Sequence, residues 1–344
     1  MSNYAIPSMQ EIAKVKGTNG LNVVSTFSGC GGSCLGFEMA GYNVLVANEF
    51  VESARETYAL NHPGVKIDPR DIRLITAKDL IELAGTDEID VLEGSPPCAS
   101  FSLSGRRDKG WGSVKSYSDT EQRADDLFFE YARLLKELQP KVFVAENVKG
   151  LVVGKAKGYF LEILKTLKAA GYRVEARVLD ASYLGVPQAR QRVIFVGVRN
   201  DLNKDPVFPK PVSARVNVVD AVPTAKEIRL GGAPNRWSTA RQPSPTITAS
   251  CGVTSPTAYL SGGGWVRTND DVRFDPETQH PLVNDKYPTQ RKYTLQEVRA
   301  LSSFPADFEL RGTFAQRWER LGRSVPPLLM KAVAETIQSE IFGI

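Results

Sequence analysis

The chain has 344 residues, 42% of them hydrophobic and 24% charged, which is enough for one large domain and a small one. Its formal net charge of +4 does not by itself indicate nucleic-acid binding, so any basic surface has to be local. No run of about eighteen apolar residues indicates a membrane span, and residues 1–20 lack the apolar core of a signal peptide. We therefore expect a cytoplasmic location and no membrane contact.

The cysteines and histidines are few and isolated. The four cysteines are Cys30, Cys34, Cys98 and Cys251, and the two histidines are His62 and His280. Because no Cys-x-x-Cys pair occurs and each histidine stands alone, we expect no metal site. We also expect no disulfide framework, because the chain is long and has the features of a protein from a reducing compartment. With so few histidines, a nucleophile would have to be activated by its surroundings rather than by a paired imidazole.

The first half of the chain alternates strand-like and helix-like segments. Strands are predicted at 21–26, 42–47, 89–92, 141–145, 174–179 and 192–198. Helices are predicted at 33–40, 51–61, 125–138 and 159–170. This alternation predicts an α/β fold with a doubly wound, mostly parallel sheet.

The pattern changes near Arg199. From 199 to 292 the chain is rich in Pro, Gly, Thr, Asn and Asp and shows little helical periodicity, which predicts a separate, irregular small domain. Helices are predicted again at 295–301 and 328–341, and we expect them to pack back on the first domain. The predicted organisation is a large domain of residues 1–198 plus 293–344 and a small domain of residues 199–292.

A glycine-rich turn follows the first predicted strand and leads into a helix, so its backbone can approach a ligand closely. Its residues are Phe27, Ser28, Gly29, Cys30, Gly31 and Gly32. About twenty residues later Glu49 ends the second strand, where an acid takes the ribose hydroxyls of an adenosine cofactor. Nicotinamide cofactors and S-adenosylmethionine both fit this pattern. Asp71 and Ile72 could add a carboxylate and an apolar contact to the adenine.

Cys98 follows the predicted strand 89–92 within the segment Gly-Ser-Pro-Pro-Cys-Ala-Ser-Phe-Ser. Ligands of open α/β sheets gather at the carboxyl ends of the strands, so a thiol held there by two prolines is placed to act as a nucleophile. A buried structural cysteine is the commoner alternative. Glu146 ends another apolar strand and could hold or protonate a ring nitrogen. Arg190 and Arg192 occupy alternate positions of an extended segment, which suits phosphate or carbonyl recognition.

Together these motifs resemble those of the DNA (cytosine-5) methyltransferases of bacteria and phages. The turn is similar to the first, cofactor-binding motif, Pro97-Cys98 with Ser102 to the nucleophile motif, and 146–148 to the Glu-Asn-Val motif. Three further motifs are matched by Gln188 with Arg190 and Arg192, by 241–248 and by 322–326. The motifs occur in the family's order and cover nearly the whole chain, which makes the combination very specific.

The resemblance implies a Rossmann-like methyltransferase fold and an enzyme that flips a cytosine out of duplex DNA. A one-carbon group would move from S-adenosylmethionine to carbon 5 while Cys98 is bonded to carbon 6. Glu146 would hold N3 and the exocyclic amine, Arg190 would support the cytosine carbonyl, and Arg192 would orient Glu146 or a phosphate.

The resemblance also implies which residues contact the cofactor and the DNA. The residues implied for the cofactor are those of the turn 27–32 together with Glu49, Phe50, Asp71, Ile72, Pro97, Leu127, Arg323 and Ser324. Those implied for DNA are Ser102, Arg106 and Arg241, with a closing loop at 100–126 and target recognition by the small domain. We expect a monomer that is associated with the nucleoid and belongs to a restriction-modification system.

Two positions depart from the family pattern. Ala99 stands where Gln usually follows the catalytic cysteine, in the loop that handles the target base. Arg323 stands where the tenth motif usually has Asn, close to the transferable group. Because a guanidinium there would repel a sulfonium, Arg323 turns outward to DNA or to an acid, pairs with the methionine carboxylate, or binds a carboxylate on the transferred group. The last alternative implies carboxy-S-adenosylmethionine as cofactor and cytosine carboxymethylation.

Three other functions fit part of the pattern. A nicotinamide-dependent oxidoreductase shares the glycine turn and Glu49 but leaves Cys98 and Glu146 unexplained. A transfer-RNA cytosine-5 methyltransferase is closer, but the Cys-Phe-Thr signature of those proteins is absent from the sequence. A catalytically silent DNA-binding relative is disfavoured because Cys98, Glu146 and both arginines are present.

Overall fold

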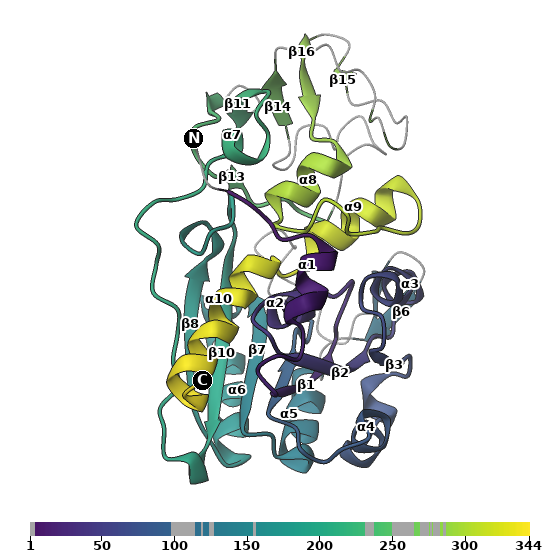
Figure 1. Cartoon of the computed structure of the whole chain (residues 1–344), viewed down its shortest axis with the longest axis vertical. Helices are drawn as coiled ribbons and strands as arrows, with labels where there is room; N and C mark the ends of the chain where they lie inside the picture. Colours follow the sequence, from purple (N-terminus) through teal and green to yellow (C-terminus); the bar gives the residue numbers. More distant parts are fainter. Residues whose placement is uncertain are drawn as a thin grey trace. The chain divides into compact units, whose positions relative to one another are not determined.

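The computed structural model describes residues 4–97, 114–117, 120–123, 127–153, 156–230, 237–249, 265–268, 275, 277, 283–284 and 287–344 (Figure 1). Cys98, Ala99, Ser102 and Arg106 therefore lie outside the described residues. The chain forms two compact units. The large unit comprises residues 13–179, 191–209 and 330–344, and the small unit comprises residues 1–12, 180–190 and 210–329.

The large unit is built on a seven-stranded sheet with the strand order β3-β2-β1-β4-β7-β10-β8. Its strands are β1 (Asn22–Thr26), β2 (Asn43–Asn48), β3 (Lys66–Asp68), β4 (Val91–Gly94), β7 (Val142–Val148), β8 (Tyr172–Asp180) and β10 (Gln191–Arg199). Neighbouring strands from β3 to β7 run parallel, and β10 pairs antiparallel with β7. The strand order reverses between β1 and β4, whose carboxyl ends form the switch point where such sheets bind ligands. The expected mostly parallel sheet is confirmed.

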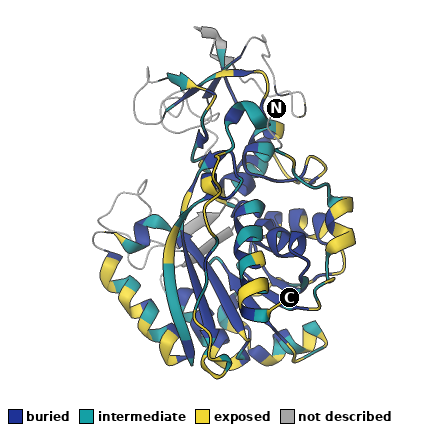
Figure 2. Cartoon of the chain, turned by 60° about the vertical axis from the view of Figure 1, so that its left-hand side comes forward, coloured by how far each residue is buried: buried dark blue, intermediate teal, exposed yellow. Residues whose placement is uncertain are grey.

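The helices of the large unit pack against this sheet through a continuous core. They are α2 (Gly32–Met39), α3 (Glu52–Asn61), α4 (Ala77–Ala84), α5 (Leu127–Leu138) and α6 (Lys157–Ala169). Leu80 of α4, Leu135 of α5 and Ile163 of α6 are fully buried in one cluster with Phe143 and Phe195 of the sheet. Figure 2 shows the strands as mostly buried, so the sheet is covered except at its ends and edges.

Every strand and helix predicted before residue 199 is present, with ends shifted by a few residues. The elements that the prediction missed include α1 (Met9–Val15), β3 and α4. Helix α4 begins with a capping box in which Thr76 and Asp79 exchange hydrogen bonds, so the sequence carries a start signal for it. The C-terminal part of α10 (Pro327–Ile337) packs in the large unit, where the Tyr42 hydroxyl donates to the Ala334 carbonyl at 3.0 Å.

The small unit contains a five-stranded sheet with the order β12-β11-β14-β16-β15, which the expectation of an irregular small domain did not specify. Its strands are β11 (Ala225–Arg229), β12 (Trp237–Thr239), β14 (Trp265–Thr268), β15 (Val283–Asn284) and β16 (Tyr287–Lys292), all paired antiparallel. These strands have at most six residues and are separated by polar, Gly- and Pro-containing segments. Hydrophobic periodicity over a longer window therefore does not reveal them.

The small unit also holds three helices among its described residues, α7 (Val218–Ala221), α8 (Leu295–Leu301) and α9 (Phe314–Arg323). Helix α8 has the predicted bounds. Helix α9 was missed although the sequence carries a signal for it: Phe314, Trp318 and Leu321 recur at helical spacing after a capping box of Thr313 and Gln316. The unit differs from the expected domain 199–292: it includes 180–190 and 293–329, while 199–209 belong to the large unit. It also contains a short parallel pair between β9 (Gln188–Ala189) and β13 (Ser244–Pro245).

Two further observations concern the described residues as a whole. Among them, no helix has the length and apolar character needed to cross a membrane. They also contain no group of His, Cys, Asp or Glu side chains arranged to hold a metal ion. Within the expected closing loop at 100–126, the backbone of β5 (Val114–Tyr117) pairs antiparallel with that of β6 (Thr120–Arg123).

Candidate active site

The glycine-rich turn joins β1 to α2 at the switch point and bends through left-handed backbone conformations. Phe27, Gly29 and Gly31 have φ values of 52, 58 and 92°. A Cβ at Gly31 would lie 2.1 Å from Nε2 of His62, so glycine is required where the turn meets this ring. A Cβ at Gly29 would meet no heavy atom within 4 Å. The turn therefore has one side closed by the protein and another side with room for a ligand.

His62 supports the closed side of the turn. Its Nδ1 lies 2.9 Å from Glu38 Oε2, and its ring stacks on Tyr58 with centroids 4.3 Å apart. Lys16 pairs with the other oxygen of Glu38 at 2.8 Å. Burial alone would raise the pKa of Glu38, but His62 and Lys16 hold that pKa below its ordinary value. These contacts make His62 a buried structural residue.

Glu49 lies just after β2, as expected, and both of its oxygens are engaged by the main chain. Oε2 accepts a hydrogen bond from the Gly29 amide and Oε1 accepts one from the Val51 amide, each at 2.7 Å. The carboxylate therefore fixes the glycine turn against the start of α3. Because each carboxylate oxygen has two lone pairs, Glu49 can also accept a ribose hydroxyl. Phe50 beside it is half-buried.

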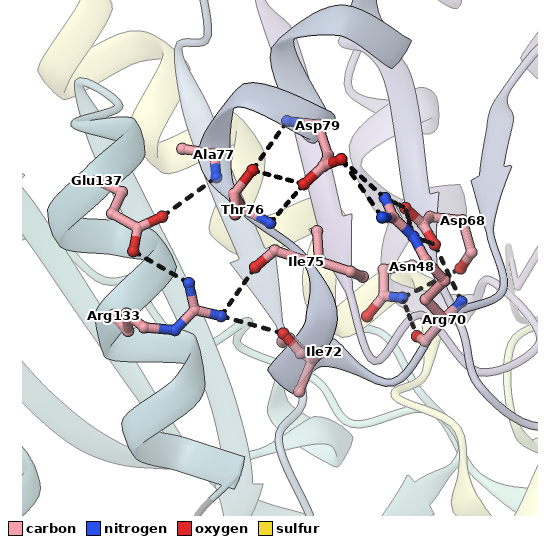
Figure 3. A network of polar contacts seen from close by, with 10 residues as sticks. All are labelled: Asn48, Asp68, Arg70, Ile72, Ile75, Thr76, Ala77, Asp79, Arg133 and Glu137. Carbon is pink, nitrogen blue, oxygen red and sulfur yellow. Dashed lines mark hydrogen bonds and ion pairs between the residues drawn. The ribbon is translucent and has the colours of Figure 1, made fainter.

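A polar network holds the loop that follows β3 (Figure 3). Arg70 donates from Nη2 to Asp68 Oδ2 at 2.6 Å, and Asn48 donates to the carbonyls of Asp68 and Arg70. On the other side of the loop, Arg133 of α5 donates to the carbonyls of Ile72 and Ile75 at 3.1 and 2.8 Å (Figure 3). The loop is therefore fixed between β2 and α5.

Three residues expected beside the cofactor lie in or next to this loop and helix. Asp71 caps a short 3-10 helix, Ile72–Leu74, and pairs with Arg73 at 2.9 Å. Ile72 and Leu127 have exposed fractions of 1% and 0% and belong to the apolar core. The side chains of Ile72 and Leu127 therefore form part of the core. Of these three residues, Asp71 is the one whose surface is partly exposed.

The Glu-Asn-Val motif at the end of β7 makes two contacts, and one of them reaches the start of the segment that leads to Cys98. Arg192 Nε lies 2.7 Å from Glu146 Oε1, and both side chains are nearly buried. Asn147 donates from Nδ2 to the Pro96 carbonyl at 2.9 Å. Pro96 precedes Cys98 by two residues, and Pro97, which is half-buried, is the last described residue of that segment. Glu146, Asn147 and the start of the nucleophile segment therefore lie together.

Arg190 and Arg192 have different partners. The strand is interrupted at Arg190, which lies between β9 and β10 and belongs to the small unit. Arg190 is 2% exposed, and its guanidinium donates to the carbonyls of Ile247 and Arg323, both at 3.1 Å. It therefore joins the segments that resemble the ninth and tenth motifs. A close approach at Gly322, where a Cβ would lie 2.4 Å from the Thr248 carbonyl oxygen, joins the same segments.

Arg323 ends α9 and points its guanidinium to an acid. Nε lies 2.7 Å from Glu319 Oε1 one turn earlier, and the Arg323 side chain is 44% exposed. Of the three arrangements expected for Arg323, this is the pairing with an acid. Ser324 follows as the C-cap and donates its hydroxyl to the Arg320 carbonyl. Arg323 and Ser324 both belong to the small unit.

The remaining predicted residues are placed as follows. Cys30 in the turn is buried, and Arg241 is exposed in the small unit. Cys98, Ser102 and Arg106 lie outside the described residues. The sequence analysis missed Glu93, a buried acid of β4 whose carboxyl contacts both flanks of the glycine turn. An acid inside an otherwise apolar strand was the signal available for it.

Comparisons with known proteins agree with this geometry. A sequence model of the family described as C-5 cytosine-specific DNA methylase matches residues 21–339. The Type II methyltransferase M.MthTI of Methanothermobacter thermautotrophicus is 30% identical over 94% of this chain and 99% of its own. M1.HphI of Haemophilus parahaemolyticus, also named a Type II methyltransferase, is 29% identical over 92% of this chain and 86% of its own.

Solved structures share the fold. A Spodoptera frugiperda DNMT2 variant superposes with a TM-score of 0.66 at 19% identity, covering 92% of this chain and 99% of its own. The Dnmt2 methyltransferase of S. pombe gives 0.63 at 19% identity, covering 94% and 99%. At these identities the similarity concerns the fold alone.

Proposed function

The chain belongs to the C-5 cytosine-specific DNA methylase family, and we propose that it methylates carbon 5 of cytosine in duplex DNA with Cys98 as nucleophile. The observation that carries the assignment of residues is the cluster at the end of β7. There Arg192 holds Glu146, and Asn147 holds the Pro96 carbonyl two residues before Cys98. The strand that leads to the proposed nucleophile segment and the strand that carries Glu146 are neighbours in one sheet, which supports the proposal.

We propose that the base is activated by covalent addition. Carbon 5 of cytosine is a poor nucleophile, so the Cys98 thiolate adds to carbon 6 of a base flipped out of the duplex. Glu146 holds N3 and the exocyclic amine, and Arg192 fixes its carboxylate at 2.7 Å. The added electron density lets carbon 5 take the methyl group, after which carbon 5 loses its proton and the bond to Cys98 breaks.

S-adenosylmethionine is the methyl donor that the family uses, and it supplies the methyl group as an electrophile. The glycine turn fits an adenosine cofactor because its side at Gly29 is open while the Glu49 carboxylate lies against the Gly29 amide. In our proposal Glu49 accepts from the ribose, and the fixed loop at Asp71 borders the adenine. Arg190 acts on the base through the segments at Ile247 and Arg323 that it ties together.

We propose methyl transfer rather than carboxymethyl transfer because Glu319 pairs with the guanidinium of Arg323. This pairing reduces the repulsion that Arg323 would exert on a sulfonium and removes the need for a carboxylate on the transferred group. Offering both donors to the wild type and to Arg323→Asn tests this choice. Transfer of a carboxymethyl group by the wild type, lost in Arg323→Asn, would overturn it.

The proposed partner is duplex DNA, with Arg241, Ser102 and Arg106 as contacts that remain predictions. We also propose that the enzyme works as a monomer without a metal ion. Because its relatives are named Type II methyltransferases, we propose that it serves in a restriction-modification system.

The decisive test is covalent trapping. A duplex that carries 5-fluorocytosine at methylation sites should form a stable adduct with the wild type, because carbon 5 then has no proton to lose. Cys98→Ala should form none. Cys251→Ala is the matched control: the proposal gives Cys251 no role, so its loss should leave adduct formation intact. An adduct with Cys98→Ala, or none with the wild type on any target duplex, would contradict the proposal.

A further inference from the structure

Glu93 is a buried acid in the centre of the large sheet. It lies in β4, where it pairs in register with Ser25 of β1 and Val144 of β7. Its exposed fraction is 1%. A carboxyl group is expensive to bury, and the proposed chemistry gives Glu93 no role at the reacting atoms. Its partners show what it does instead.

Every described hydrogen-bond partner of the Glu93 carboxyl is a neutral hydroxyl or thiol. Oε1 accepts from the Ser25 hydroxyl and from the Cys34 thiol, the latter at 3.5 Å, and Oε2 accepts from the Ser33 hydroxyl at 2.7 Å. The other titratable groups that interact with Glu93 are Tyr58 of α3, Tyr131 of α5 and Glu146 of β7. Burial raises the pKa of Glu93 above its ordinary value. The carboxyl thus gains its stabilisation from donors that it holds in fixed positions.

These donors flank the glycine turn. Ser25 is in β1, just before the turn, and Ser33 is in the first turn of α2, just after it. The Ser25 hydroxyl is also 2.7 Å from the hydroxyl of Ser28, which lies within the turn. One carboxyl therefore fixes both ends of the turn and, through Ser25, a residue inside it.

The same strand leads directly into the nucleophile segment. Gly94 packs closely on β1, since a Cβ there would lie 2.5 Å from Thr26 Oγ1. Residues 95–98 continue from this point to the cysteine. A shift of Glu93 would therefore move the glycine turn relative to the strand that carries the nucleophile.

We propose that Glu93 is a positioning residue that sets the geometry of the cofactor turn against the strand carrying Cys98; this rests on the proposed function. Glu93 touches neither the base nor the cofactor. Its loss leaves the Ser25 and Ser33 hydroxyls without their acceptor and frees the two ends of the turn. Cofactor affinity should fall by about tenfold, because the Glu49 contact to Gly29 depends on the shape of the turn.

The test compares Glu93→Gln with Asp90→Asn. Asp90 precedes β4 at the opposite end, is 5% exposed, and accepts from the Asn22 amide and from Lys141 at 2.8 and 2.7 Å. Both substitutions remove a buried carboxylate, but only Glu93 contacts the turn. Calorimetric Kd values for S-adenosylmethionine and S-adenosylhomocysteine should rise about tenfold in Glu93→Gln and stay unchanged in Asp90→Asn, with DNA affinity unchanged in both.

Ser33→Ala provides an independent variant, because it removes one donor without disturbing the strand. It should weaken cofactor binding in the same direction as Glu93→Gln, and it decides the matter if Glu93→Gln does not fold. The positioning role is overturned if both variants fold and bind the cofactor with wild-type affinity. If Glu93→Gln does not fold, wild-type affinity in folded Ser33→Ala is enough to overturn it. Trapping by the wild type reports separately on Cys98, so failure of the proposed function is distinguishable from failure of this inference.

Discussion

The contact between Asn147 and Pro96 offers a direct test of how the nucleophile is positioned. Asn147 is 4% exposed and donates from Nδ2 to the Pro96 carbonyl at 2.9 Å, while its Oδ1 accepts from the Val148 amide at 2.8 Å. Asn147→Asp keeps the shape of the side chain and the second of these bonds. It replaces the donor with an oxygen that faces the Pro96 carbonyl.

The magnitude follows from that lost donor. A buried carbonyl left without a partner costs about 1–3 kcal/mol. Because each 1.4 kcal/mol changes an equilibrium constant about tenfold, the aligned form of the segment before Cys98 should become about 5- to 150-fold less populated. The rate of covalent adduct formation with a 5-fluorocytosine duplex at saturating cofactor should fall within the same range. Cofactor Kd should stay within about twofold, since neither the glycine turn nor Glu49 touches Asn147.

Asn22→Asp is the matched control for this prediction. Asn22 also donates from its side-chain amide to a carbonyl, that of Glu88 at 3.0 Å, but it lies at the amino end of β1. Its adduct rate should equal that of the wild type. The reasoning is refuted if folded Asn147→Asp is trapped as fast as the wild type, because the Pro96 contact would then not align the nucleophile.

Three more outcomes are expected. Gly29→Ala, with open space around it, should destabilise the protein by about 1–2 kcal/mol in urea unfolding, from the strain of its left-handed backbone alone. Gly31→Ala carries the same strain and adds a Cβ 2.1 Å from His62 Nε2, which costs about 1–3 kcal/mol more, so equal losses in the two variants would contradict this. Burial raises the pKa of Glu93 in the folded protein. The folded protein therefore keeps a proton on Glu93 that the unfolded chain begins to lose at about pH 4.3. The contribution of Glu93 to the free energy of unfolding accordingly declines as the pH rises from about 4.3 through the folded-state pKa. Glu93→Gln should therefore flatten the pH dependence of urea unfolding in that window, and an unchanged slope would count against it. Glu319→Gln removes the acid paired with Arg323 and should weaken binding of the cationic S-adenosylmethionine more than that of neutral S-adenosylhomocysteine; an equal effect on both would show that Arg323 does not act by charge.

The parts of the site that the sequence predicts are those fixed by local structure. The glycine turn and Glu49 are recognisable because a strand, a turn and a helix follow one another within a few residues. The small unit's strands escaped prediction because they are short, and their pairing joins residues far apart in the chain. The contact of Arg192 with Glu146 depends on the antiparallel register of β10 on β7, which places Arg192 opposite Val148. This strand register cannot be deduced from the residues of a single sequence.

Glu93 shows the same limit for buried polar groups. Glu93 follows the apolar residues Val91 and Leu92 in its strand, and its partners Ser25 and Ser33 lie 68 and 60 positions away. Only the parallel pairing of β1 with β4 brings them within hydrogen-bonding distance. Sequence reasoning can flag such an acid as costly to bury, but it cannot identify what compensates the cost.

The strand order explains why residues so far apart form one site. Strands β2, β1, β4 and β7 are neighbours in the sheet and run parallel, so their carboxyl ends meet at one edge. That edge receives Glu49 from β2, the glycine turn from β1, the nucleophile segment from β4 and Glu146 from β7. Hydrogen bonds run between each adjacent pair: Glu49 to the Gly29 amide, Ser25 to Glu93, and Asn147 to the Pro96 carbonyl. Each contact joins one adjacent pair of strand ends, so its loss should act on the feature that it holds. The Glu49 and Glu93 contacts act on the glycine turn and hence on cofactor binding, whereas the Asn147 contact acts on the segment that leads to Cys98.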